Sequence, residues 1–81
     1  MTKAQEKALQ EEYERRFNRW EATLDARDRA KAEGDDENVE RFRVLEKSLV
    51  RQIDAMDRVL AIMGYSRTSG ENETIEFIKI K

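Results

Sequence analysis

Two helix-length stretches that meet at Gly34 constrain this chain more than any other feature of its sequence. The sequence contains no proline, and residues 3–33 contain no glycine. This first stretch is rich in Ala, Glu, Arg, Lys and Leu, which are strong helix formers. Its larger apolar residues recur at steps of four, four, three and four, on one stripe of a helix: Leu9, Tyr13, Phe17, Trp20 and Leu24. The pattern predicts one helix over residues 3–33.

The segment that follows combines the signals that stop one helix and start another. Gly34 suits the left-handed conformation just past a helix C-terminus. Asp35 and Asp36 are candidates for the N-cap of the next helix. We expect a turn at residues 34–36 and a second helix over residues 37–63. One continuous helix that bends here is the alternative, because a glycine inside a helix costs only about 1 kcal/mol.

Two helices joined by so short a turn are expected to pack antiparallel. The numbers of facing residues then have a nearly constant sum. Pairing the two apolar stripes gives five layers with sums of 69 or 70: Leu24 with Leu45, Trp20 with Leu49, Phe17 with Ile53, Tyr13 with Met56, and Leu9 with Leu60. The sequence therefore predicts a coiled-coil-like helical hairpin in which apolar residues meet at every layer.

The apolar face of the second helix is wider than one facing helix can cover. Ala55, Val59, Ile62 and Met63 lie beside its main stripe. Such a surplus needs a second contact, either the C-terminal segment of the chain or another copy. Because twofold dimers are the commonest oligomers, we expect a homodimer in which two hairpins form a four-helix bundle.

The C-terminal sequence TIEFIKIK, residues 74–81, is the only stretch that is typical of a β-strand. Successive side chains of a strand point to opposite faces. Ile75 and Phe77 would then share one face, and Ile78 and Ile80 the other. Three isoleucines and a phenylalanine in eight residues favour a segment that packs against something.

What this strand pairs with is left open by the sequence. Gly64 is placed to end the second helix, and residues 65–81 then form a C-terminal turn and β segment. A local hairpin would use residues 65–68 as its first strand and residues 69–73 as its turn. The alternatives are pairing with a second copy, addition to the sheet edge of another protein, and a disordered terminus. We expect the helices to form without residues 71–81.

Residues that carry chemistry are scarce. The chain has no cysteine and no histidine, which excludes thiolate and imidazole metal sites. Its three scattered glycines do not supply a phosphate-binding loop. The carboxylate pairs Asp25/Asp28 and Asp54/Asp57 are interpreted as solvated surface, because the inward positions of both helices are apolar. We expect no enzymatic activity, no cofactor and no metal.

Charged residues make up 42% of the chain, yet the net charge is only −2 and the signs are mixed along its length. This balance argues against a polyanion-binding tail. A nucleic-acid-binding regulator that uses Arg and Lys on the outer helix faces is the alternative function. No apolar run approaches the roughly 20 residues that span a bilayer, and the start lacks the apolar core of a signal peptide. We therefore expect a cytoplasmic protein.

The leading prediction is a single domain, residues 1–81, that acts as a small non-enzymatic protein–protein interaction module. It would serve as an adaptor, an assembly factor or an inhibitor, through surplus apolar residues of the second helix and the strand-like tail. The candidate interaction surface is Ala55, Val59, Ile62, Met63, Ile75, Phe77, Ile78 and Ile80.

Overall fold

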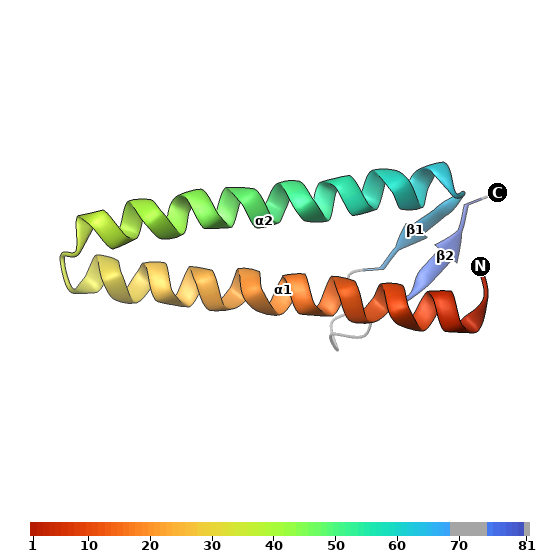
Figure 1. The fold of residues 1–81 in the computed structure, drawn as a ribbon, viewed down its shortest axis with the longest axis horizontal. Helices are drawn as coiled ribbons and strands as arrows, with labels where there is room; N and C mark the ends of the chain where they lie inside the picture. Colours follow the sequence, from red (N-terminus) through yellow and green to blue (C-terminus); the bar gives the residue numbers. More distant parts are fainter. Residues whose placement is uncertain (69–74, 81) are drawn as a thin grey trace.

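Two long antiparallel helices and a small β-hairpin make up the computed structural model, which describes residues 1–68 and 75–80. The elements are α1 (Lys3–Ala32), α2 (Asp36–Ile62), β1 (Tyr65–Arg67) and β2 (Phe77–Lys79). The strands lie against the helices at the end where α1 begins and α2 ends, and both termini lie there (Figure 1). We call this the open end. The predicted helical hairpin is confirmed, and the bent continuous helix is excluded.

Both ends of α1 carry the capping groups that a stable helix needs. At its start the Thr2 hydroxyl accepts a hydrogen bond from the backbone N–H of Gln5 at 3.1 Å, and the Gln5 side chain accepts one from Thr2 N–H at 3.0 Å. At its end Gly34 takes the left-handed conformation, with φ of 72°. The N–H of Gly34 donates to the carbonyl of Lys31, and that of Asp35 to the carbonyl of Ala30. This is a Schellman turn, which satisfies carbonyls that the helix end leaves unpaired.

The same turn starts α2. Asp35 is its N-cap, and its carboxylate accepts a hydrogen bond from the backbone N–H of Asn38 at 3.3 Å. At the other end Gly64 again adopts a positive φ, of 88°, just past the C-cap Met63. The observed helices therefore begin and end within one residue of the predicted bounds, because the glycines and aspartates that set those bounds act locally.

The C-terminal strand pairs within its own chain. β1 and β2 are antiparallel, with Tyr65 opposite Lys79 and Arg67 opposite Phe77. The ladder continues on both sides, through the bond from Ile80 N–H to the Gly64 carbonyl at 2.9 Å and the matching bond between Thr68 and Glu76. Of the four alternatives left open by the sequence, the structure contains the local hairpin. The turn predicted over residues 69–73 lies outside the described residues.

The main core lies at the open end, where the β-hairpin adds a third layer to the two helices. Tyr13, Ile53, Leu60 and Ile75 are buried there, and they form one cluster. Partly buried residues from all four elements pack around it: Leu9, Phe17, Met56, Tyr65 and Phe77. A two-stranded hairpin is marginal by itself, so this packing is what makes the strands possible.

Toward the turn at Gly34 only two layers remain, and the packing is thinner. Leu49 is 2% exposed, but Leu45, predicted to complete the layer with Leu24, is 39% exposed. The buried positions on α1 here are small, namely Thr23 and Ala30. The Thr23 hydroxyl donates to the backbone carbonyl one turn earlier at 2.7 Å, which satisfies it without a partner on α2. Near the turn, the contact between the two helices therefore depends on a few buried residues.

Candidate interaction surface

A polar cluster beside the main core fixes the β-hairpin to the helices. Asp57 of α2 accepts two hydrogen bonds from the guanidinium of Arg67 in β1, at 2.7 and 3.0 Å. It also accepts a hydrogen bond at 2.8 Å from the hydroxyl of Tyr13, which is fully buried in α1. A bidentate Arg–carboxylate pair holds both partners in one geometry. One residue from each helix and one from the first strand are thus locked together.

Aromatic rings and a second polar contact complete this attachment. The Arg67 guanidinium lies over the rings of Tyr13 and Phe17, with its central carbon 5.4 and 5.0 Å from their centroids, a favourable cation–π distance. The Tyr13 ring also packs on Phe77 of β2, with centroids 5.9 Å apart. Farther along the hairpin, the Gln10 amide donates to the backbone carbonyl of Ile75 at 2.6 Å. Both strands are therefore attached to α1 as well as to each other.

The electrostatics of the cluster favour its charged form. Burial by itself would raise the pKa of Asp57, but hydrogen bonds from Arg67 and Tyr13 outweigh burial and lower it. Burial and the adjoining Asp57 carboxylate raise the pKa of Tyr13, so its hydroxyl stays a donor. The hydrogen bonds to Asp57 also raise the pKa of Arg67. The ion pair consequently persists through the neutral range.

These shifts predict that acid weakens the attachment of the hairpin. Because the folded-state pKa of Asp57 lies below its ordinary value of 3.8, its contribution to stability is complete above that value and is lost as the pH falls through the folded pKa. We expect the free energy of unfolding, measured with urea, to fall more steeply below about pH 4 in the wild type than in Asp57→Asn. Other carboxylates titrate in both proteins, so the difference isolates Asp57. Parallel profiles would contradict the predicted charge pairing.

The structure divides the eight predicted surface residues into two groups. Ile75 is 6% exposed and belongs to the core, and Phe77 is half-buried against Tyr13. Both therefore serve the fold of this chain. The other six are exposed: Ala55, Val59, Ile62, Met63, Ile78 and Ile80. The predicted division of the strand, with Ile75 and Phe77 on one face and the remaining isoleucines on the other, matches this burial.

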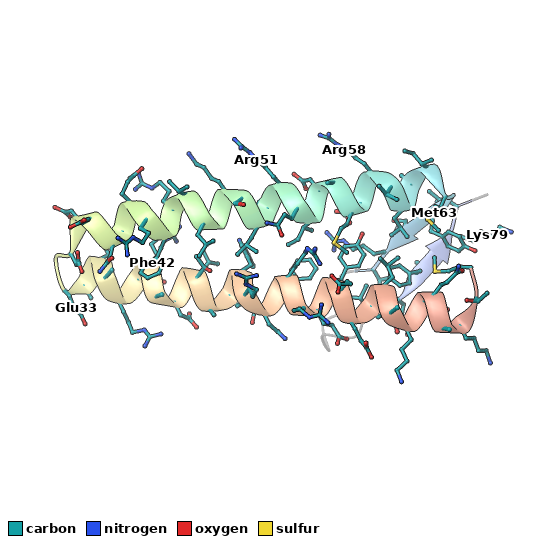
Figure 2. The ribbon with its side chains drawn as sticks, viewed as in Figure 1. Glu33, Phe42, Arg51, Arg58, Met63 and Lys79 are labelled. Carbon is teal, nitrogen blue, oxygen red and sulfur yellow. The ribbon has the colours of Figure 1, made fainter. Side chains whose placement is uncertain are left out.

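The exposed residues from α2 and β2 meet at the open end. Ile62 is 86% exposed, Ile80 58% and Met63 50%. A shallow open hollow of about 270 Å³ lies between the end of α2 and the end of β2, where Figure 2 shows Met63 and Lys79. It is lined by Ala61, Ile62, Met63, Gly64, Lys79 and Ile80. Its size and openness suit one apolar side chain of a protein better than an enclosed small molecule.

The structure places Asp57 differently from the sequence-based prediction. The pair Asp54/Asp57 was assigned to solvated surface, which is wrong for Asp57, because it is half-buried and ion-paired. One signal could have found it. A tyrosine in a buried stripe needs a partner for its hydroxyl, and the layer sum near 70 places Asp57 opposite Tyr13. Nothing in the sequence marked Arg67, because its position depends on the hairpin.

Several of the remaining charges form ion pairs along the helices or between them. Arg15 and Arg16 both pair with Glu12, and Arg27 reaches Glu46 across the two helices at 2.6 Å. Within residues 1–68 and 75–80, no three acidic residues are grouped so as to hold a metal ion. Neither helix of the described structure is long and apolar enough to cross a membrane.

Comparisons of the chain with protein-family models, with curated proteins and with solved structures found no match.

Proposed function

We propose that this chain is a small non-enzymatic protein–protein interaction module, an adaptor, assembly factor or inhibitor, which works as a homodimer that forms a four-helix bundle. The observation that supports this is the balance of apolar surface. In the described residues, nine large apolar side chains are at least 37% exposed, whereas six apolar residues are buried. Solitary exposed apolar residues are ordinary, but a contiguous group marks a contact site.

The open end has the properties of a site that binds a protein. Ile78 and Ile80 extend the apolar surface of α2 onto a hairpin that the Asp57–Arg67 pair holds in place. A partner that binds a pre-organised surface does not have to order it first, so less binding free energy is lost. Lys79 lines the hollow beside Ile62, so an apolar side chain next to a carboxylate on the partner would suit it.

The proposal is tested by site-specific photo-crosslinking in the native cell. A photoreactive amino acid replaces Ile80 at the open end or, as the matched control, Lys47, which is exposed on α2. We expect illumination to give a discrete adduct from position 80 and none from position 47. Ile78→Asp, combined with the photoreactive residue at position 80, should keep its helicity and lose that adduct. No adduct from position 80, in a protein that remains folded, would refute the proposed site.

A further inference from the structure

One flank of α2 carries an unbroken row of uncharged residues. They recur at steps of three, four, three, four and three, and all six are exposed: Leu45, Ser48, Gln52, Ala55, Val59 and Ile62. We call this row the α2 seam. It stands out in a chain whose residues are 42% charged. A repeat of 3.5 residues is the spacing at which two helices pair along their length.

The seam lies on the side of α2 that the β-hairpin leaves uncovered. Asp57 binds Arg67 of β1, and Val59 follows it by two residues, which places it about 160° away around the helix. The hairpin and the seam are therefore on opposite flanks of α2 near Val59, and at its end the seam reaches the hollow that Ile62 lines with Lys79 and Ile80. One edge of the seam adjoins core positions such as Leu49. At the other edge are Arg51 and Arg58, which project away from α1 in Figure 2.

We propose that the α2 seam pairs with the α2 seam of a second copy, antiparallel, about a twofold axis between Gln52 and Ala55. This inference rests on the proposed function and names the partner of one part of the interaction surface. In this register the numbers of facing residues sum to 107. Leu45 then faces Ile62 of the other copy, Ser48 faces Val59, and Gln52 faces Ala55. The remaining apolar residues of the open end stay available to another protein.

The residue sizes along the seam favour this arrangement over a parallel one. Antiparallel pairing sets the long Gln52 against the small Ala55, and the small Ser48 against Val59. A parallel pair would instead place each residue against its own copy, which leaves gaps at Ser48 and Ala55 and stacks two glutamines. The Gln52 amide donates a hydrogen bond to the Ser48 hydroxyl within the helix, at 3.4 Å. Both side chains can therefore keep a hydrogen-bond partner when the interface buries them.

A second copy also extends the contact at the edge nearest the core. With neighbouring positions summing to 105, Met63, which is 50% exposed, meets Phe42 of the other copy. The paired segment is about 25 Å long, from 17 steps of about 1.5 Å. It buries several hundred Å² on each copy, at the lower end of specific interfaces. The dimer is thus expected to dissociate on dilution.

The charges at the outer edge give the interface a signature in salt. In the proposed register Arg51 approaches Arg58 of the other copy, and the twofold axis repeats the contact. Like charges repel, and salt screens exposed charges beyond about 10 Å at 0.1 M. Raising NaCl from about 0.05 to 0.5 M should therefore tighten the dimer several-fold in sedimentation equilibrium. Replacing Arg58 by Gln should reduce that salt dependence.

The register is tested by disulfide trapping, which is clean because the chain has no cysteine. Ser48→Cys and Val59→Cys are made separately and oxidised alone or mixed. We expect the mixture to give a heterodimer linked through positions 48 and 59, and each variant alone to stay unlinked. In the antiparallel register, position 48 and its own copy lie 11 steps apart, about 16 Å along the axis. Cysteines whose Cα atoms are more than about 7 Å apart do not link.

Two results would overturn the proposal. If each single variant links to itself, the helices are parallel. If no variant links, and the wild type sediments as a single chain at every concentration, there is no dimer. Ala55→Glu, at an exposed position, should convert the dimer to a monomer without changing the free energy of urea unfolding of the monomer. Lys47→Glu, the control, should change neither the oligomeric state nor that free energy. Adducts from position 80 that persist when trapping fails would leave the protein–protein interaction module standing, without the homodimer.

Discussion

Replacing Tyr13 by alanine is expected to destabilise the chain by about 3–5 kcal/mol, as large aromatic truncations in a core do. Tyr13 is fully buried, and Ile53, Leu60 and Ile75 are buried with it. Its removal opens a cavity where all three layers meet and withdraws one hydrogen bond from Asp57. A chain of this size has only about 4–12 kcal/mol of stability in total. The measurement is urea unfolding, followed by circular dichroism at a fixed chain concentration.

Tyr13→Phe is the matched control, because it keeps the ring and removes only the hydroxyl. Asp57 retains both hydrogen bonds from Arg67, so the carboxylate is not left unpaired. A hydrogen bond to a charged group contributes about 1.5–3 kcal/mol, and we expect the loss to lie at the lower end of that range. If the alanine variant is no less stable than the phenylalanine variant, the ring is not part of the core.

The helical hairpin could be predicted because its determinants are local. Gly34 and Asp35 set the turn within a few residues, and the two apolar stripes, Leu9–Leu24 and Leu45–Leu60, each repeat at helical spacing over 16 residues. The layer sum near 70 also holds in the structure for Tyr13, whose hydroxyl bonds to Asp57, a sum of 70. Periodicity and capping decide an antiparallel helix pair almost alone.

The thin packing near the turn could not be predicted from the sequence. The layer of Leu24 and Leu45 follows the same period as the others, but Leu45 is 39% exposed. Periodicity reports which residues face the partner helix, and it does not report whether a third layer covers them. That third layer is the β-hairpin, which reaches only the open end (Figure 1). The burial of Thr23 could not be predicted for a different reason: a threonine in a charged helix does not contribute to an apolar pattern.

The candidate site depends on contacts between segments far apart in the sequence. The exposed residues of α2 could be predicted, but the contacts of the hairpin could not. The exposure of Val59, Ile62 and Met63 follows from the width of the α2 apolar face, which the sequence contains. The burial of Ile75 does not, because the alternation in TIEFIKIK assigns two faces without saying which one meets the helices. The Asp57–Arg67 pair joins residues ten apart through a strand pairing that no local pattern fixes.

The contrast between Ile75 and Ile78 gives the second large effect. Both are isoleucines of one segment, three residues apart, but Ile75 is 6% exposed and Ile78 is 53% exposed. Truncating a buried isoleucine to alanine costs about 2–5 kcal/mol, whereas an exposed one usually changes stability by less than about 0.5 kcal/mol. We therefore expect Ile75→Ala to lower the free energy of urea unfolding by at least about 2 kcal/mol more than Ile78→Ala.

This pair also decides whether the C-terminal segment belongs to the core. The sequence alone led us to expect helices that form without residues 71–81, but Ile75 packs with Tyr13, Ile53 and Leu60. If the tail is core, Ile75→Ala should lower the stability of both helices, seen as an earlier loss of helical circular dichroism. Equal stability of the two variants would mean that the C-terminal segment is not part of the core. Ile75 would then rejoin Ile78 as a candidate contact residue, and the three-layer core would be wrong.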